Sequence, residues 1–351
     1  MLQKLVGGLI FSGILFSQTT ANPQFSVIGD LVMDQINDSP KLSSSGVEIA
    51  IQGNVNPFAR ADVYLHKHND ESPIELEEAV LTIERGLPLG LGLRLGKFRP
   101  DLGRINKVHA HLFPFIEAPT GMKKVLGEEF WAPTGVEANI LLPLPWYSNV
   151  SVGYFDSGIR GDIHEGEGES HDLEQNHDHN HGEEKQDFAL SGRWSHFFDL
   201  NDINHIEIGT SGYLGDKNIL IGADLKYKWR PNKYKSLTLE VEIFQYACWD
   251  DGPEDLYQNN CTGTYYGMVN YQFNKSYNIG VIGEVWVHQE EDEISPALFI
   301  GYSPVEESAV FRLKIGQVNH FYLPGEDKIK QDLIVTAQLI WSLGPHKPHR
   351  Y

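Results

Sequence analysis

The stretch LIVTAQLIWSL, residues 333–343, decides the fold of this chain. Apolar side chains occupy every second position of this stretch, and Thr336 and Gln338 lie between them. Because successive side chains of a strand point to opposite faces, this alternation predicts a strand with one apolar face. The same period recurs along the chain, as in Ala223-Asp-Leu-Lys-Tyr-Lys-Trp229, without long helical periodicity. We therefore expect an all-β protein.

The alternation predicts about 16 strands, most of them about 9–12 residues long, which is the length that a tilted strand needs to cross a bilayer. They lie near residues 24–34, 46–56, 58–67, 76–85, 90–98, 134–142, 147–155, 188–197, 203–213, 219–229, 235–247, 264–273, 277–288, 295–303, 307–317 and 330–343.

The links between these strands alternate in length. Short links lie at 56–57, 86–89, 143–146, 198–202, 230–234, 274–276 and 304–306, and long links at 35–45, 68–75, 99–133, 156–187, 248–263, 289–294 and 318–329, with one brief exception near 214–218. Short turns on one side and long loops on the other are typical of a transmembrane, antiparallel, up-and-down β-barrel.

A soluble β-sandwich or jelly roll is the alternative, since its strands also alternate. Such folds do not sort their loops by length. Aromatic residues also gather at the strand ends here, at 146–147, 197–198 and 227–229 for example, as an interfacial girdle requires. We therefore expect a closed barrel in contact with the lipid of the bacterial outer membrane.

The first residues have the pattern of a secretory signal. Lys4 precedes an apolar run, Leu5 to Phe16, and small and polar residues follow up to Ala21. The run of about a dozen residues is shorter than the roughly 20 that a membrane-spanning helix needs. We expect a signal peptide over residues 1–21 and a barrel over residues 22–351.

Charge and cysteine content narrow the class further. The net charge of −20 argues against a nucleic-acid partner, because phosphate contacts need clustered Lys and Arg. The two cysteines, Cys248 and Cys261, are expected to form a disulfide in an exported chain, and two free thiols are the alternative.

A resemblance to a known family is carried by the stretch Gly96-Lys-Phe-Arg-Pro-Asp-Leu-Gly-Arg-Ile-Asn-Lys-Val-His-Ala-His111, together with Glu77-Glu78-Ala79 and Leu87-Pro-Leu-Gly-Leu91. These motifs resemble proteobacterial porin-like outer-membrane barrels related to phosphate-selective porins, some of which are labelled zinc-regulated TonB-dependent receptors. The resemblance implies an outer-membrane barrel without settling the solute. A strand is predicted from residue 24, so we expect no plug domain of the kind that a TonB-dependent receptor needs.

The long link 99–133 is the first candidate site. Its prolines and its apolar run 112–116 indicate an ordered loop, which we expect to fold toward the lumen and narrow the pore. Charges at such a constriction set ion preference. The expected constriction residues are Arg99, Arg104, Lys107, Glu117, Lys123 and Lys124. The alternative is an outside loop that packs on its neighbours.

The lumen wall is the second candidate site. Charged residues at inward positions of the predicted strands are Arg60, Asp62, Glu78, Arg94, Lys226, Lys228, Glu240, Glu242, Arg312 and Lys314. Opposed acidic and basic walls would polarise the water of a channel. Alternatively, these residues pair with one another and fill the interior.

The acidic, histidine-rich segment 162–187 is the third candidate site, an extracellular loop in this topology. Its candidate metal ligands are His164, His171, His177, Asp178, His179 and His181. Residues two apart in an extended chain point the same way, so three imidazoles could converge on Zn²⁺ or a similar divalent ion. A solvated, disordered acidic loop is the alternative.

The function expected from these features is diffusion of small hydrophilic or ionic solutes through a porin-like channel. A receptor or metal-capture protein acting through the histidine-rich loop is the alternative, and a structural or adhesive barrel with a closed lumen is a third. The sequence lacks the G-x-S-x-G, H-E-x-x-H and P-loop motifs, so we expect no enzyme and no required cofactor. Assembly into a homo-oligomer is compatible with this class.

Overall fold

The computed structural model describes residues 23–37, 39–68, 73–159, 188–248, 261–288, 291–305, 308–322 and 329–344. Among them, strands dominate and all belong to one sheet. The strands are β1 (Gln24–Ile36), β2 (Ser39–Ser43), β3 (Val47–Asn56), β4 (Ala59–Lys67), β5 (Glu75–Ile83), β6 (Gly92–Lys97), β7 (Thr134–Leu141), β8 (Tyr147–Phe155), β9 (Ala189–Asn201), β10 (Asn204–Gly215), β11 (Asn218–Asn232), β12 (Lys235–Cys248), β13 (Cys261–Gln272), β14 (Tyr277–Val287), β15 (Glu291–Val305), β16 (Ala309–Tyr322) and β17 (Ile329–Leu343).

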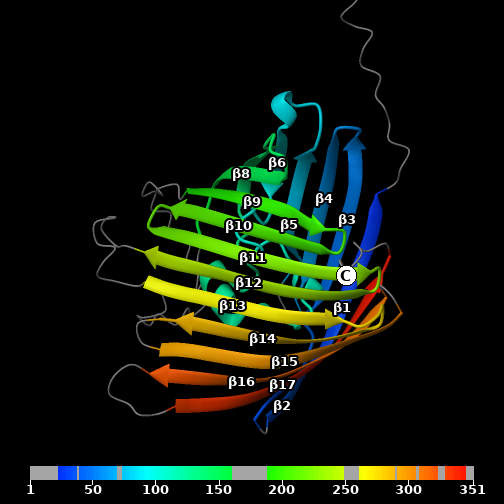
Figure 1. Cartoon of the computed structure of the whole chain (residues 1–351), viewed down its shortest axis with the longest axis vertical. Coiled ribbons are helices and arrows are strands. Elements are labelled where there is room, and N and C mark those ends of the chain that lie inside the picture. The colour runs from blue at the N-terminus through cyan, green and yellow to red at the C-terminus, as the bar shows by residue number, and fades with distance from the viewer. Residues whose placement is uncertain are drawn as a thin grey trace, which may run out of the picture.

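The sheet closes on itself. From β3 onward, strands adjacent in the chain pair antiparallel and lie side by side in Figure 1, and β17 returns to β1, where Gly29 lies opposite Trp341. β1 pairs with β2 through residues 32–36 and with β3 through residues 24–29, so β2 and β3 share one place in the ring. The result is a closed 16-stranded antiparallel barrel, which confirms the predicted fold class.

Two links that the sequence predicts to be long are strand over more than half of their length. The predicted link 35–45 contains β2, and the predicted link 289–294 is shortened because β15 begins at Glu291. Both segments are polar or acidic and lack apolar alternation, so their pairing is set by the neighbouring strand. Residues 291–294, for instance, pair with residues 319–322 of β16. The sorting of loops by length is therefore less strict than predicted.

The outer surface of the barrel is apolar. On β11, Ile221 is 63% exposed, whereas the neighbouring Leu220 is fully buried on the inward face. Aromatic rings lie together at the end of the barrel that carries the short turns, as in the stacked pair Tyr277 and Tyr302, whose centroids are 4.8 Å apart. A closed strand ladder with an apolar exterior satisfies every backbone group within lipid. In the described part of the chain, no helix has the length and apolarity to cross a bilayer.

The aromatic girdle differs in one detail from the expectation. Tyr147 and Phe197 lie opposite each other on β8 and β9, and both line the interior cavity of the barrel. Their chain neighbours Trp146 and Phe198 form a separate pair, with centroids 5.6 Å apart. Adjacent residues of a strand face opposite sides, so only one of each aromatic doublet can face lipid.

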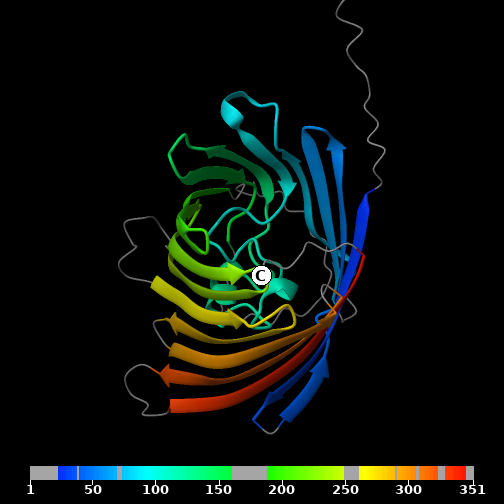
Figure 2. The same cartoon turned by 45° about the vertical axis from the view of Figure 1, so that its right-hand side comes forward.

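The segment 98–133 joins β6 to β7 and lies inside the ring of strands (Figure 2, teal). It contains a short 3-10 turn, η2 (Ala110–Leu112), and one short helix, α1 (Thr120–Leu126). We call this segment the third loop. Its position confirms the prediction that it folds toward the lumen.

Candidate functional site

The third loop packs apolar side chains against the wall in the long-loop half of the barrel. Buried loop residues are Phe98, Leu102, Ile105, Phe113, Phe115, Met122, Val125, Leu126 and Trp131. They pack on inward aromatic residues of the wall: Phe115 lies 6.1 Å from Phe299, and Trp131 lies 5.0 Å from Phe155, measured between ring centroids. Burying this much apolar surface is the main force that holds the loop inside.

Two glycines allow the loop to approach the wall closely. A Cβ atom on Gly103 would lie 2.1 Å from Oε1 of Glu242, and one on Gly121 would lie 2.4 Å from Oγ1 of Thr264. Gly103 also has a φ of 63°, in the left-handed region that glycine adopts readily. Larger residues at these positions would push the loop away from the wall.

Carboxylates of the wall accept hydrogen bonds from the loop backbone. The N–H of Asp101 donates to Glu137 at 2.7 Å, that of Arg104 to Glu242 at 2.6 Å, and that of Thr120 to Glu284 at 2.9 Å. Irregular backbone inside a barrel lacks ladder partners, so its N–H groups need such acceptors. Glu242 is fully buried under the loop, so this predicted lumen-wall residue serves as an anchor.

The structure does not bring the six predicted constriction residues into one ring. Arg99, Arg104 and Lys107 line the cavity below the loop. Glu117, Lys123 and Lys124 are absent from its lining. Lys123 pairs with Glu128 at 2.8 Å and Lys124 with Glu293 at 2.6 Å, near the long-loop end of the barrel. Lys123 and Lys124 belong to helix α1, away from the cavity-lining residues, which spacing alone did not reveal.

The three cavity-lining residues are held by ion pairs. Arg99 pairs with Glu77, Arg104 with Glu207 at 2.7 Å, and Lys107 with Asp101 at 2.5 Å. Burial of Asp101 disfavours its charged form, but Lys107 and Arg193 outweigh burial and hold the pKa of this carboxyl below its ordinary value. The carboxylate is therefore charged at neutral pH and keeps Lys107 in place.

Below the third loop, on the short-turn side, lies a cavity of about 1100 Å³. The loop residues from Arg99 to Phe115 form its roof, and inward residues of the barrel wall form its sides. Of the predicted wall residues, it is lined by Asp62, Glu78, Arg94, Lys226, Lys228, Glu240 and Arg312. Arg60, Glu242 and Lys314 do not line it: Arg60 pairs with Asp62, and Lys314 with Glu284.

Some charges of the wall pair across neighbouring strands. Arg94 pairs with Glu137 at 3.0 Å across β6 and β7, and Lys226 with Glu240 at 3.4 Å across β11 and β12. These pairs join neighbouring strands, because cross-strand residues lie closer together than residues across the lumen. They correspond to the alternative expectation, in which charges of the wall pair with one another.

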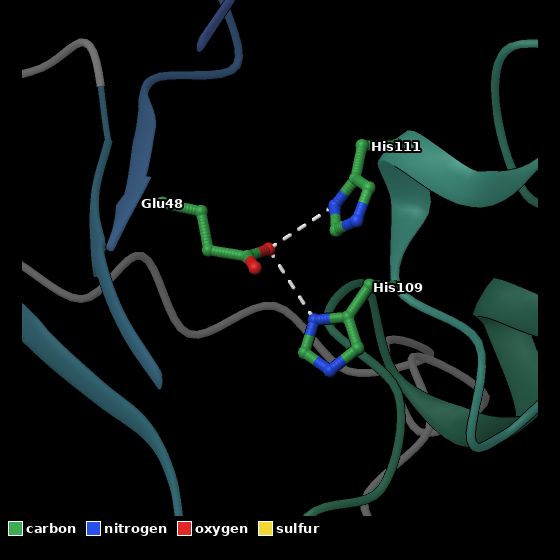
Figure 3. A group of neighbouring side chains, drawn as sticks. All are labelled: Glu48, His109 and His111. Carbon is green, nitrogen blue, oxygen red and sulfur yellow. Dashed lines mark hydrogen bonds and ion pairs between the residues drawn. The ribbon is translucent and has the colours of Figure 1, made fainter. Parts of the chain in front are cut away.

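Three further residues meet where the loop touches the wall, and sequence reasoning did not single them out as a site. Glu48 of β3 faces His109 and His111 of the loop, as Figure 3 shows. The signal in the sequence is a His-x-His spacing inside a loop expected to be ordered. Its partner, Glu48, is 61 residues away from His109 and becomes visible only in the fold.

Some of the features predicted from the sequence lie outside the described residues. All the candidate metal ligands of segment 162–187, from His164 to His181, belong to this part, as does the expected signal peptide over residues 1–21. The side chains of Cys248 and Cys261 are also undescribed, although their backbones end β12 and begin β13.

No family model matches the chain. An uncharacterized protein of Aquifex aeolicus is 24% identical over 352 residues, which cover 90% of this chain and 71% of that protein. Among solved structures, OmpT, an outer membrane protein of Vibrio cholerae in a trimer form, superposes with a TM-score of 0.60 at 10% identity and covers 92% of this chain and 99% of its own.

Two other solved structures match over similar lengths. The outer membrane channel DcaP of Acinetobacter baumannii has a TM-score of 0.56 at 9% identity, covering 93% of this chain and 99% of its own. OprB of Pseudomonas putida has a TM-score of 0.59 at 9% identity, covering 92% of this chain and 94% of its own. At these identities the likeness concerns the fold. The chain has the closed-barrel fold of outer-membrane porins, and this fold with its apolar exterior places it in the bacterial outer membrane.

Proposed function

We propose that this protein is a porin-like channel through which small hydrophilic or ionic solutes diffuse across the outer membrane. The observation that carries the proposal is the cavity of about 1100 Å³ inside a closed 16-stranded barrel. Barrels of about this size retain an aqueous lumen unless loops block it. Here the third loop narrows the lumen, and the space below it is lined by charged, amide and hydroxyl side chains together with apolar ones.

The lining of the cavity supports ionic solutes. Eight Lys and Arg residues and six Asp and Glu residues line it, so its side chains carry a small excess of positive charge in a chain of net charge −20. The basic residues are Arg94, Arg99, Arg104, Lys107, Arg193, Lys226, Lys228 and Arg312. This excess is compatible with the resemblance to relatives of phosphate-selective porins, and we include membership of that group in the proposal.

Bilayer recordings test the channel. Purified protein in planar bilayers is expected to give stepwise conductance in KCl, and reversal potentials in a salt gradient report ion preference. Addition of phosphate or of small sugars identifies solutes that block or cross. A barrel that inserts, as judged by protease protection in vesicles, yet carries no current would refute the channel and favour a structural role.

The alternative function, metal capture through segment 162–187, is supported by its sequence alone. We propose reversible binding of Zn²⁺ by His177, His179 and His181 as its form. Calorimetric titration of the wild type and of a chain with these three histidines changed to Asn separates the alternatives. Equal heats from the two proteins would refute metal capture by this segment.

A homo-oligomer is likewise part of the proposal, and native mass spectrometry in detergent tests the oligomeric state.

A further inference from the structure

A carboxylate and two imidazoles converge at the contact between the third loop and β3 (Figure 3). Nδ1 of His109 and Nδ1 of His111 each lie 3.3 Å from the same oxygen, Oε2 of Glu48. The three donor atoms lie within 4.8 Å of one another. Tetrahedral coordination of Zn²⁺ with bonds of about 2.0–2.1 Å places neighbouring ligand atoms about 3.3 Å apart, so both nitrogen–oxygen distances match an edge of that tetrahedron.

The hydrogen bond on the far side of His109 fixes which nitrogen is available. Nε2 lies 3.0 Å from Oε1 of Glu78, which accepts its hydrogen. Nδ1 faces the Glu48 carboxylate and, when deprotonated, directs its lone pair at that carboxylate. Two acceptors that face each other repel unless a proton or a cation lies between them. A carboxylate behind a ligating histidine is also the usual support of metal-bound imidazole.

Carboxylates around the group have oxygens that accept no hydrogen bond from the described residues. Oε1 of Glu48 and Oε2 of Glu77 are buried without a hydrogen-bond partner in the described part of the chain. Arg99 pairs with Glu77, and its backbone N–H donates to Glu78. The contacts described for Glu48 itself are those to the two histidines. Buried carboxylates of this kind are stabilised by a bound cation.

The backbone on both sides of the histidines is held in place. The guanidinium of Arg312 donates to the carbonyl of His111 at 2.8 Å, and that of Arg99 donates to the carbonyl of Val108 at 3.0 Å. The 3-10 turn η2 brings the two rings to the same side, with centroids 5.8 Å apart. The ligand set is therefore preorganised, which reduces the entropy that binding must offset.

We propose that Glu48, His109 and His111 form a site for a divalent transition metal, with Zn²⁺ as the best fit. Two imidazoles and one carboxylate suit Zn²⁺, Ni²⁺ or Cu²⁺, whereas Ca²⁺ and Mg²⁺ prefer oxygen ligands alone. All three residues line the lumen cavity, so water completes the coordination and the ion exchanges with the aqueous interior. A bound ion ties the third loop to β3 and adds positive charge beside the solute pathway.

This site is separate from the histidine-rich segment 162–187 and does not require the channel to conduct. The test therefore uses a full-length background chain in which that segment cannot compete. Its five histidines, His164, His171, His177, His179 and His181, are changed to Asn. The refolded, metal-free protein is titrated with Zn²⁺ against a competing chromophoric chelator. We expect binding of about one Zn²⁺ per chain, and a loss of at least tenfold in affinity for Glu48→Gln and for His111→Gln.

The control uses a second histidine pair beside a carboxylate within the described residues, His66 and His68 near Glu129. The double change His66→Gln and His68→Gln in the same background is expected to leave the high-affinity binding unchanged. A background chain without zinc affinity, or affinities equal in all variants, would overturn the proposal. So would loss of binding in the His66 and His68 variant alone.

A second measurement needs no ligand variant and decides the matter if the variants fail to fold. X-ray absorption at the zinc edge of the loaded background chain is expected to show two imidazole nitrogens at about 2.0 Å among four light ligands. A shell without imidazole scattering would overturn the assignment. Conductance is recorded separately, so a failed channel and a failed metal site remain distinguishable.

Discussion

Glu242 of β12 accepts the backbone N–H of Arg104 at 2.6 Å, although 138 residues separate the two in the chain. The same carboxylate accepts the N–H of Ile105 at 3.1 Å and the hydroxyl of Tyr266 at 3.1 Å. Glu242 is thus the point at which the wall holds the bend of the third loop. Under the proposed channel function, this contact links the stability of the loop to the width of the lumen.

The first prediction is that Glu242→Ala widens and destabilises the channel. The substitution leaves two buried N–H groups without an acceptor, which costs about 1–3 kcal/mol each. The loop then samples positions away from the wall. We expect higher and noisier single-channel conductance, and faster tryptic cleavage at Arg104 and Lys107. Glu84→Ala, at an exposed position on the short-turn side, is the control and should behave like the wild type. Unchanged conductance in Glu242→Ala would show that the loop is held by its apolar contacts alone.

Much of the barrel was predictable because lipid imposes one apolar face on every spanning strand. The alternation from Leu333 to Leu343 corresponds to the end of β17, and the inward fold of the third loop followed from its apolar run. β2 was missed since its sequence, Ser-Pro-Lys-Leu-Ser, has no apolar alternation and its pairing depends on β1.

The site was less predictable because it depends on which loop residue meets which strand. Residue types identified inward charges such as Lys226 and Glu240 but not their partners across neighbouring strands. The junction of Glu48 with His109 joins segments 61 residues apart. Local sequence does not show that these residues meet, since their contact is set by the register of the whole ring and by the packing of the loop core.

The second prediction concerns ion preference. Lys226 and Lys228 line the cavity on the short-turn side, where they contribute positive charge to the solute pathway. In the double variant Lys226→Gln and Lys228→Gln we expect the permeability ratio of Cl⁻ to K⁺ to fall about fivefold. Each charge in a screened, water-filled lumen contributes about 0.5 kcal/mol, so the two contribute about 1 kcal/mol. Reversal potentials in a KCl gradient measure the ratio. Lys217→Gln, exposed at the opposite end of the barrel, serves as the control. A ratio that shifts equally in both proteins would contradict a role for the lumen lysines.

The third prediction concerns the closed barrel. Its strand ladder runs around the ring through β1 and β17 without an edge, so the native state should resist SDS at room temperature and unfold only on boiling. Unheated and boiled samples should therefore differ in gel mobility. Migration at one position under both conditions would argue against a stable closed barrel in detergent.

The fourth prediction is an intramolecular disulfide between Cys248 and Cys261. Ala247 pairs with Cys261 in the ladder, so the two cysteines end neighbouring strands. A bridge across a loop of this length contributes about 3 kcal/mol by restricting the unfolded chain. Intact-mass analysis after alkylation without reductant should detect no added label. Two labelled thiols in protein taken from the envelope would contradict the bridge. Cys248→Ser should still assemble, because the link lies at the rim.

The last prediction concerns the pH dependence of loop docking in metal-free protein. Burial opposes protonation of His109, but hydrogen bonds to Glu48 and Glu78 outweigh it and raise its pKa from 6.5 to about 9. The groups facing the ring are Glu48, Tyr64, Glu77, Glu78, Arg99 and His111.

Because the folded pKa of His109 exceeds the unfolded one, its contribution to stability is fully present below pH 6.5. It is lost as the pH rises through about 9. This shift corresponds to about 3 kcal/mol. With a chelator present, urea unfolding measures the difference in the free energy of unfolding between the wild type and His109→Gln. This difference should be about 3 kcal/mol larger at pH 6 than at pH 10. A difference that does not change with pH would mean that His109 is neutral in the folded barrel. Zn²⁺ binding at Nδ1 competes with the proton, so saturating zinc should flatten the same profile.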